Sequence, residues 1–232
     1  MARTVKKPEE RRVEFLLAAQ GLFIEHGYYA TSVDDIAKEM GVAKGLFYYY
    51  FRSKEDLVGQ LVDHLWEGAE KDYIDVKDRD DLNALEKLML YSTLRGKVKL
   101  QQTYLVEVVV KEPNSPLVQQ LRDRGFKVLT PIMGDIITQG VEEGFFDTEY
   151  AYEAAGFLIR GGEGLISADM RDPEAVVRMY MITLDIWERV LGAEKGTFKR
   201  LMDEHEDLMR KFAQAADRVV TGDDTDKKEG DD

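Results

Sequence analysis

Three consecutive tyrosines, residues 48–50, stand close to a lysine and a glycine in the segment GVAKGLFYYYF. Tyrosine hydroxyls donate hydrogen bonds to phosphate oxygens and the rings can lie against sugars, which fixes a protein on nucleic acid without reading its bases. Lys44 is the long donor in this segment that can reach a guanine edge. Gly45 is unfavourable inside a helix by about 1 kcal/mol relative to alanine, but it permits close approach to another molecule. These residue types therefore predict contacts to nucleic acid.

The elements around this segment predict a helix-turn-helix. Apolar residues at helical spacing end at Gly27, and a second helix begins at TSVDD, where Ser32 and Asp35 have the spacing of a capping box, and ends at Gly41. A short third helix is expected over about residues 43–50, and SKED opens a fourth that runs to about residue 75. In a helix-turn-helix the second helix of the motif enters the major groove of DNA.

The helical spacing also predicts which side chains of the third helix face outward. Phe47 and Phe51 are four residues apart and are expected to face the core. This leaves Lys44, Gly45, Tyr48 and Tyr49 outward, with Tyr50 at the rim. The alternative is a small packing unit whose tyrosines only cover the core. At most one of three consecutive tyrosines can face a core, so DNA contact is the favoured interpretation.

The segment TSVDDIAKEMGVAKGLFYYYFRSKEDLV resembles the DNA-binding domain of the TetR family of bacterial transcriptional regulators, and AAQGLFIEHGYYATSV resembles the family's first helix and glycine turn. The resemblance covers about residues 10–60. Ala43 and Leu46 depart from it, because hydroxyl side chains are frequent there, and this leaves the operator sequence open. The resemblance implies DNA contacts from Thr31, Lys44, Gly45, Leu46, Tyr48, Tyr49, Tyr50 and Lys54.

The residue pattern does not support an enzyme. His26, His64 and His205 are far apart and lack the spacing of a zinc site. The sequence has no G-x-x-x-x-G-K-[ST] phosphate loop and no G-x-S-x-G elbow. We therefore expect no catalytic residue, no metal and no cofactor.

Composition adds further expectations. The chain has 232 residues and no cysteine, which excludes disulfides and fits a reducing cytoplasm. The net charge is −13, but the first 60 residues contain nine basic and nine acidic residues and are neutral, so the head remains compatible with DNA. No apolar run approaches the roughly 20 residues of a membrane span, and no apolar segment follows the basic N-terminus. These features predict a soluble cytoplasmic protein.

The whole chain is expected to be all-α. We predict a helix-turn-helix DNA-binding domain over residues 1–53, a helical dimerisation and effector-binding domain over 54–220, and a disordered acidic tail over 221–232. Pro131 predicts a kink or a break in its helix. Beyond the fourth helix, the expected helices are 81–95, 98–111, 115–143, 148–169, 173–191 and 196–220.

The family resemblance implies a homodimer, and the helix expected at 148–169 is rich in alanine and glycine. Small residues let helices approach closely, which suits a contact across a two-fold axis. Packing within one chain is the alternative. The candidate interface residues are Ala151, Ala155, Gly156, Gly161 and Trp187.

The resemblance also implies an effector pocket in the larger domain, although aromatic and methionine residues at helical spacing are also typical of plain core. Glu107 interrupts the apolar run YLVEVVV, so its charge needs a partner, water or the surface. An ion pair with Arg160 or Lys111 is favoured over a cationic ligand. The candidate pocket residues are Trp66, Tyr91, Tyr104, Glu107, Phe126, Met133, Phe157 and Arg160.

Together these observations predict a TetR-like regulator that binds a double-stranded DNA operator. The expected mode of action is that of a homodimeric repressor of a palindromic site, released by a small-molecule effector, and the word repressor comes from the resemblance alone. An architectural DNA-binding protein without a sensor remains open, although about 160 residues after the head exceed what dimerisation needs. A soluble all-α enzyme is disfavoured.

Overall fold

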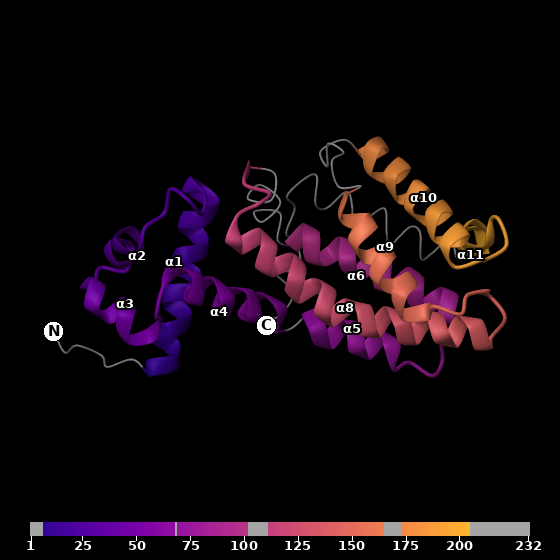
Figure 1. The fold of residues 1–232 in the computed structure, drawn as a ribbon, viewed down its shortest axis with the longest axis horizontal. Helices are drawn as coiled ribbons and strands as arrows, with labels where there is room; N and C mark the ends of the chain where they lie inside the picture. Colours follow the sequence, from indigo (N-terminus) through magenta and orange to yellow (C-terminus); the bar gives the residue numbers. More distant parts are fainter. Residues whose placement is uncertain (1–6, 68, 102–110, 165–172, 205–232) are drawn as a thin grey trace, which may run out of the picture. The chain divides into compact units, whose positions relative to one another are not determined.

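The computed structural model describes residues 7–67, 69–101, 111–164 and 173–204, which form ten α-helices and no strand (Figure 1). The predicted all-α class is confirmed. The described residues divide into two compact units, the first ending at Glu70 but including 111–125, and the second formed by the remainder. The expected domain boundary between residues 53 and 54 therefore falls inside the first unit. The expected tail at 221–232 lies outside the described residues.

The first unit contains the predicted helix-turn-helix. Its helices are α1 (Pro8–His26), α2 (Val33–Glu39), α3 (Lys44–Tyr50), α4 (Lys54–Trp66) and the first turns of α8 (Pro116–Glu142). The short α2 and α3 contact each other, and α1 contacts both α2 and α4. This arrangement places α3 on a support of three other helices.

Local hydrogen bonds explain where α2 and α4 begin. The Asp35 amide donates to the Ser32 hydroxyl at 3.2 Å and the Ser32 amide donates to the Asp35 carboxylate at 2.8 Å, which confirms the predicted capping box. At α4, the Asp56 amide donates to the Ser53 hydroxyl at 3.2 Å. The Asp56 carboxylate instead accepts from the Arg52 amide at 2.7 Å. Each cap satisfies amides that a helix start leaves without a partner.

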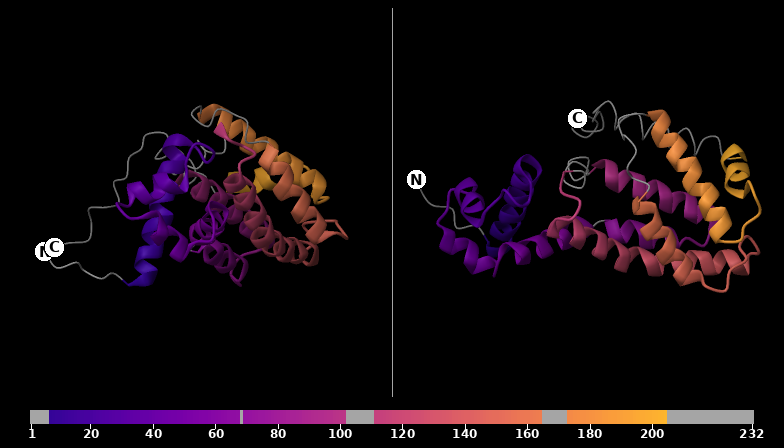
Figure 2. Two further views of the ribbon diagram at one scale, coloured as in Figure 1. Left: turned by 60° about the vertical axis from the view of Figure 1, so that its left-hand side comes forward. Right: turned by 45° about the horizontal axis from the view of Figure 1, so that its top comes forward.

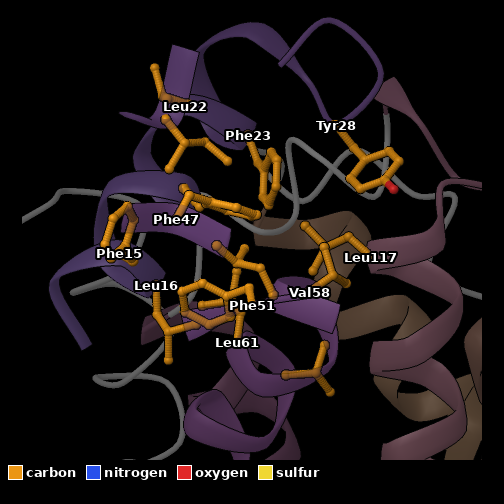
Figure 3. Close-up of a cluster of buried hydrophobic side chains, with 14 of the residues drawn as sticks. Phe15, Leu16, Leu22, Phe23, Tyr28, Phe47, Phe51, Val58, Leu61 and Leu117 are labelled. Atoms are coloured by element: carbon orange, nitrogen blue, oxygen red, sulfur yellow. The ribbon is translucent and has the colours of Figure 1, made fainter. Parts of the chain in front are cut away.

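The core of the first unit is a cluster of aromatic and aliphatic side chains (Figure 3). Phe15 of α1 packs against Phe47 of α3 and against Phe51, with ring centroids 6.0 and 5.8 Å away. All three side chains are buried, as predicted for Phe47 and Phe51. The helix α4 belongs to the same core, which explains why the first unit extends beyond residue 53. Its buried side chains are Leu57, Val58, Leu61 and Val62.

The second unit holds α5 (Ala69–Lys77) from Lys71 on, α6 (Ala84–Gln101), the rest of α8, and three later helices. The single helix expected from Ser53 to about residue 75 is wrong, because α4 ends at Trp66 and α5 begins at Ala69. The break expected between residues 95 and 98 is also absent, since α6 is continuous there.

The long α8 runs without interruption through Pro131, so a break into two helices does not occur. Pro131 is exposed to solvent, where water can hydrate the carbonyl that loses its amide partner in the preceding turn. The described parts of the later predicted helices are confirmed. They are α9 (Ala151–Gly164), α10 (Pro173–Val190) and α11 (Thr197–Glu204), and α9 contacts α10, as both views of Figure 2 show.

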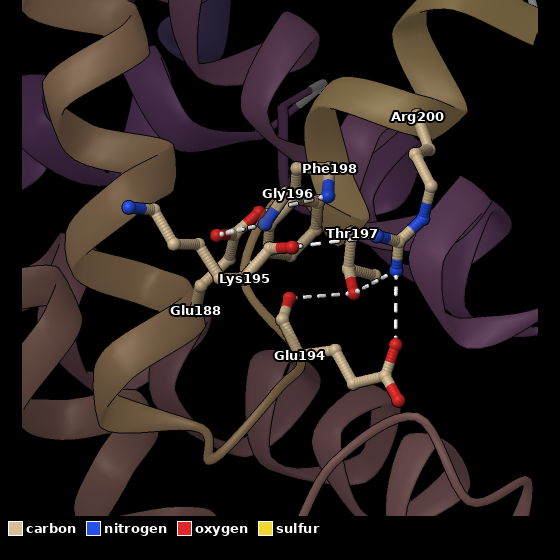
Figure 4. A network of polar contacts seen from close by, with 7 residues as sticks. All are labelled: Glu188, Glu194, Lys195, Gly196, Thr197, Phe198 and Arg200. Atoms are coloured by element: carbon tan, nitrogen blue, oxygen red, sulfur yellow. Dashed lines mark hydrogen bonds and ion pairs between the residues drawn. The ribbon is translucent and has the colours of Figure 1, made fainter.

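A buried carboxylate joins α10 to the start of α11 (Figure 4). Glu188 is 6% exposed and accepts hydrogen bonds from the Gly196 amide at 2.8 Å and the Phe198 amide at 3.0 Å. These amides belong to the first turn of α11, where donors lack partners within the helix. The rings of Trp187 and Phe198 pack edge to face beside this contact, with centroids 6.3 Å apart.

Candidate nucleic-acid interface

The outer face of α3 carries the residues expected to contact DNA. Lys44 and Gly45 are exposed, Tyr48 is 53% exposed and Tyr49 is 73% exposed, while Phe47 beneath them is fully buried. Among the described residues, no side chain or distant backbone atom lies within 4 Å of a Cβ placed on Gly45. The helix therefore presents a lysine, two ring hydroxyls and a bare stretch of backbone to solvent.

The turn between α2 and α3 fixes the direction of this face. Gly41 has φ +63°, in the left-handed region that an L side chain rarely adopts. The amide of Val42 then donates to the Ala37 carbonyl at 3.0 Å, which closes the turn. A glycine at this position thus lets α3 leave α2 at the angle of a helix-turn-helix.

Leu46 and Tyr50 lie on a different side of α3. Both are half-buried and pack against the aromatic core, and the Tyr50 ring lies 5.8 Å from the Phe15 ring. Tyr50 also supports Tyr49 by an edge-to-face contact with centroids 4.9 Å apart. Packing is the role that the contacts give to these two side chains, and DNA contact from them stays a prediction.

The Thr31 side chain has a partner inside the first unit, and the DNA contact expected at this position stays a prediction. Thr31 is 2% exposed, and its hydroxyl donates to the Gly27 carbonyl at 2.8 Å. This hydrogen bond at the C-terminal end of α1 connects the start of α2 to α1. A buried, hydrogen-bonded hydroxyl in this position stabilises the support of α3.

Lys54 is half-buried and its ammonium contacts the protein itself. Its ammonium donates to the carbonyls of Tyr28 and Thr31, both at 2.9 Å, and lies 3.9 Å from the centre of the Tyr28 ring. Burial lowers the pKa of Lys54, an effect that Glu55 and Glu112 oppose. Two of its three donors are therefore committed to the α1–α2 turn, and a phosphate contact from Lys54 stays a prediction.

Tyr28 is the centre of a polar cluster that the sequence did not reveal. It is 3% exposed, its hydroxyl donates to Glu55 at 2.9 Å and its amide donates to Glu112 at 2.7 Å. Burial, followed by the hydrogen bond to Glu55, raises the pKa of Tyr28 above its usual range. A Cβ on Gly27, at φ +91°, would lie only 2.5 Å from a Glu112 oxygen, so the turn accepts only glycine there. The cluster holds the α1–α2 turn rigidly under α3.

The candidate base-reading lysine has an intramolecular partner. The Lys44 ammonium donates to an Asp34 carboxylate oxygen at 2.7 Å, and the two side chains are 48% and 66% exposed. This hydrogen bond raises the pKa of Lys44, so the lysine is fully charged at neutral pH. Two further exposed basic side chains, Lys38 and Arg52, belong to the same motif and were not among the predicted contacts.

The six expected pocket residues that the structure describes differ in their surroundings. Trp66 packs against the core of the first unit, and Phe157 is 65% exposed in the second. Tyr91 and Met133 are fully buried in the second unit, where the Tyr91 ring lies 5.1 Å from that of Tyr73. Core packing is therefore the role that the structure gives to Tyr91 and Met133.

The remaining pocket candidates divide into a surface pair and two residues without a described position. The Arg160 guanidinium lies 4.5 Å from the Phe126 ring centre and is exposed. It also pairs with Glu163 at 3.5 Å. Tyr104 and Glu107 lie outside the described residues, so the suggested partners of Glu107 are untested.

Three of the five expected interface residues are interior. Ala155 is fully buried and Trp187 is 4% exposed, while a Cβ on Gly156 would lie 3.4 Å from the Phe126 ring of the same chain. Packing within one chain, the stated alternative, holds for these three. Ala151 is half-buried and Gly161 is exposed.

Four exposed large apolar side chains lie on two helices that contact each other, and they were not among the expected interface residues. They are Phe157 of α9, which was expected in the pocket, and Val177, Met181 and Ile182 of α10. The segment between Phe157 and Val177 is rich in charged and small residues, so composition did not predict that these apolar side chains are exposed on neighbouring helices.

The comparisons with known proteins agree with this geometry. Residues 15–61 match the family described as bacterial regulatory proteins, tetR family. The repressor KstR2 of Mycobacterium tuberculosis is 30% identical over 152 residues, 63% of this chain and 74% of the relative. The fatty acid metabolism regulator protein of Bacillus subtilis is 29% identical over 146 residues, 60% and 73% of the two chains. A TetR/AcrR regulator structure from Thermobifida fusca has TM-score 0.53 and 27% identity, covering 77% of this chain and 97% of that one.

The buried core under an exposed recognition helix defines a helix-turn-helix DNA-binding protein. The chain belongs to the TetR family of transcriptional regulators, as the match to most of KstR2 shows. It is accordingly a regulator of transcription and not an enzyme. Among the described residues, no helix has the length and apolar character that crossing a membrane requires.

Proposed function

We propose that the protein is a cytoplasmic, homodimeric repressor that binds a palindromic operator and is released by a small-molecule effector. The observation that carries this proposal is the outer face of α3, where Lys44, Gly45, Tyr48 and Tyr49 are exposed above a buried Phe47. Lys44 reads a base edge, and the two tyrosine hydroxyls donate to phosphates on either side.

The exposed apolar side chains of α9 and α10 support the dimer. Phe157 is 65% exposed, Val177 60% and Ile182 48%, on two helices that contact each other. Burying these side chains against the same surface of a second copy would remove apolar area from water, at about 25 cal/mol per Å². The two recognition helices of a dimer then occupy successive major grooves about 34–36 Å apart.

The names of the relatives support an effector with a large apolar part. One relative is a regulator of fatty acid metabolism, and the solved KstR2 structure is described as that of a ketosteroid transcriptional regulator. A FadR structure from Bacillus subtilis was solved with stearoyl-CoA. We propose that this chain responds to a ligand of similar character, which changes the separation of the two heads in the dimer.

Selection of bound duplexes from a random DNA pool tests the DNA-binding part of the proposal. We expect an inverted repeat whose half-site centres are about one helical turn apart. Sedimentation of the same preparation should show a dimer. A selected pool without sequence enrichment, or enrichment of a single unrepeated half-site, would contradict the proposed mode of action.

A thermal-shift screen tests the effector. Fatty acids, their CoA thioesters and steroids are added singly, and a ligand at 100 times its dissociation constant is expected to stabilise the protein by about 2.7 kcal/mol. Such a ligand must also release the selected operator. Stabilisation by none of these classes would favour a DNA-binding protein without a sensor.

A further inference from the structure

Asp34 is the only residue that hydrogen-bonds to the Lys44 side chain among the contacts of the described residues. It stands in the first turn of α2, ten positions before Lys44, and the 2.7 Å contact spans the turn between the two helices of the motif. The pair is on the surface, where an ion pair adds little to folding stability. The effect of the pair that bears on function is therefore the position that it gives to the Lys44 ammonium.

The carboxylate of Asp34 has no part in capping α2. The neighbouring Asp35 fills that role, since it accepts from both the amide and the hydroxyl of Ser32. Asp34 is thus left to face outward and reach the Lys44 ammonium. Asp35 therefore caps α2, whereas Asp34 contacts Lys44 of α3.

A lysine has a flexible stem and three rotatable N–H donors. When one donor of Lys44 is held by Asp34, the ammonium is fixed in place while the other two donors remain available for a base edge. Holding the stem in one geometry removes part of the ordering that base contact would otherwise require. This benefit arises only on a sequence that offers acceptors at that point.

The charge of Asp34 acts on every DNA alike. A carboxylate beside the phosphate backbone repels it, and this repulsion does not depend on the base sequence. The same residue therefore weakens binding to random DNA and strengthens the contribution of Lys44 on the operator. Both effects widen the difference between specific and non-specific binding.

We propose that Asp34 is a positioning residue for DNA recognition, which holds Lys44 toward the base edge that it reads and thereby sets the specificity of the repressor. This inference rests on the proposed function, because it requires Lys44 to contact a base. Asp34 itself need not touch DNA.

The test compares the full chain with Asp34→Asn, Lys44→Ala and the double variant, binding the selected operator and a random duplex at several salt concentrations. Asp34→Asn should raise affinity for random DNA while the operator-to-random ratio falls by about tenfold, within the discrimination that one good base contact provides. In the Lys44→Ala background the same change should leave the ratio unaltered. Glu39→Gln is the matched control, since it removes one exposed charge from α2, and it should raise both affinities equally.

The outcomes separate this inference from the proposed function. Should Asp34→Asn change both affinities by the same factor, as Glu39→Gln does, Asp34 contributes charge alone and the inference is overturned. An equal fall in the ratio with and without Lys44 would also overturn it. If the wild-type chain selects no operator, the proposed function itself fails. If Lys44→Ala keeps the full preference for a selected operator, Lys44 reads no base and the inference about Asp34 is overturned, while operator binding stands. Circular dichroism checks that each variant is folded.

Discussion

The tyrosines of α3 differ in what surrounds each ring, although they are consecutive in the sequence. Tyr48 and Tyr49 are mostly exposed, and Tyr50 is half-buried against the Phe15 ring. An exposed hydroxyl can donate to a phosphate without any rearrangement of the helix. The hydroxyls of Tyr48 and Tyr49 are therefore the ones expected to contribute to DNA affinity.

Tyr48→Phe should weaken binding to the operator by about 1–2 kcal/mol per half-site, because a hydroxyl that donates to a charged phosphate is lost while the ring stays. The preferred sequence should not change, since phosphate contacts carry no base information. Binding titrations on the operator and its single-base variants measure both quantities. Tyr150→Phe serves as the control, because it removes an exposed hydroxyl from the residue just before α9, far from α3 in the sequence. Unaltered affinity in Tyr48→Phe would contradict the proposed orientation of α3.

Lys54 belongs to the residues that build the site without forming its surface. Replacing it with methionine keeps most of the apolar stem but leaves the carbonyls of Tyr28 and Thr31 without their donor. We expect a loss of about 1–3 kcal/mol in the free energy of unfolding. Lys44→Ala should leave that free energy nearly unchanged, because its one partner is a surface carboxylate. Urea titration followed by circular dichroism distinguishes the two, and equal stabilities would show that the Lys54 contacts are unimportant.

The capping carboxylates link the helix starts to pH. The hydrogen bond from the Ser32 hydroxyl, followed by that from its amide, lowers the pKa of Asp35. The amide of Arg52 lowers the pKa of Asp56 in the same way. A carboxyl whose pKa is lower in the folded state stabilises that state at pH values above the ordinary value of about 3.9, and the stabilisation is lost as the pH falls toward the folded-state pKa.

Asp35→Asn and Asp56→Asn should therefore flatten the acid side of the stability curve. Between about pH 4 and pH 2 the wild-type chain should lose stability more steeply than the variants. Urea denaturation at a series of pH values, followed by a probe of the first unit, measures the slopes. Asp63→Asn is a suitable control within α4, because Asp63 is exposed and lies outside both caps. Identical acid slopes in wild type and both cap variants would contradict the role of these carboxylates.

The start of α11 depends on a single buried side chain. Glu188→Ala removes the acceptor of two amides, those of Gly196 and Phe198, and should lower the free energy of unfolding by about 2–4 kcal/mol. Glu188→Gln keeps one oxygen acceptor, so its free energy of unfolding should lie between those of the wild type and Glu188→Ala. Glu194→Ala is the matched control, since this exposed residue pairs with Arg200 at 3.3 Å and should change stability by less than about 1 kcal/mol. Hydrogen exchange of the α11 amides should rise only in the Glu188 variants, and unchanged exchange would show that the helix is held by its apolar contacts.

At the scale of the whole chain, local patterns predicted the fold and the outer face of α3, but long-range contacts determined the rest. The Ser32 cap, the Gly41 turn and the burial of Phe47 each depend on neighbours within a few residues. The Glu112 contact joins positions 84 residues apart, so no spacing rule could reveal it. The Lys54 ammonium likewise reaches the carbonyls of Tyr28 and Thr31, 26 and 23 residues away, so spacing along the chain did not reveal these contacts either.

The dimer proposal rests on the surface that this folding leaves exposed. Phe157→Glu places a charge where a second copy is expected to bury a ring, so the chain should sediment as a monomer and lose most of its operator affinity. Its melting temperature at low concentration should change little, since Phe157 is 65% exposed in one chain. Ile74→Glu is the control at another exposed apolar position, on α5, and it should remain dimeric. Gly156→Leu should instead destabilise the chain itself, because its added atoms meet the Phe126 ring. A dimeric Phe157→Glu variant that binds the operator normally would show that α9 and α10 do not form the interface.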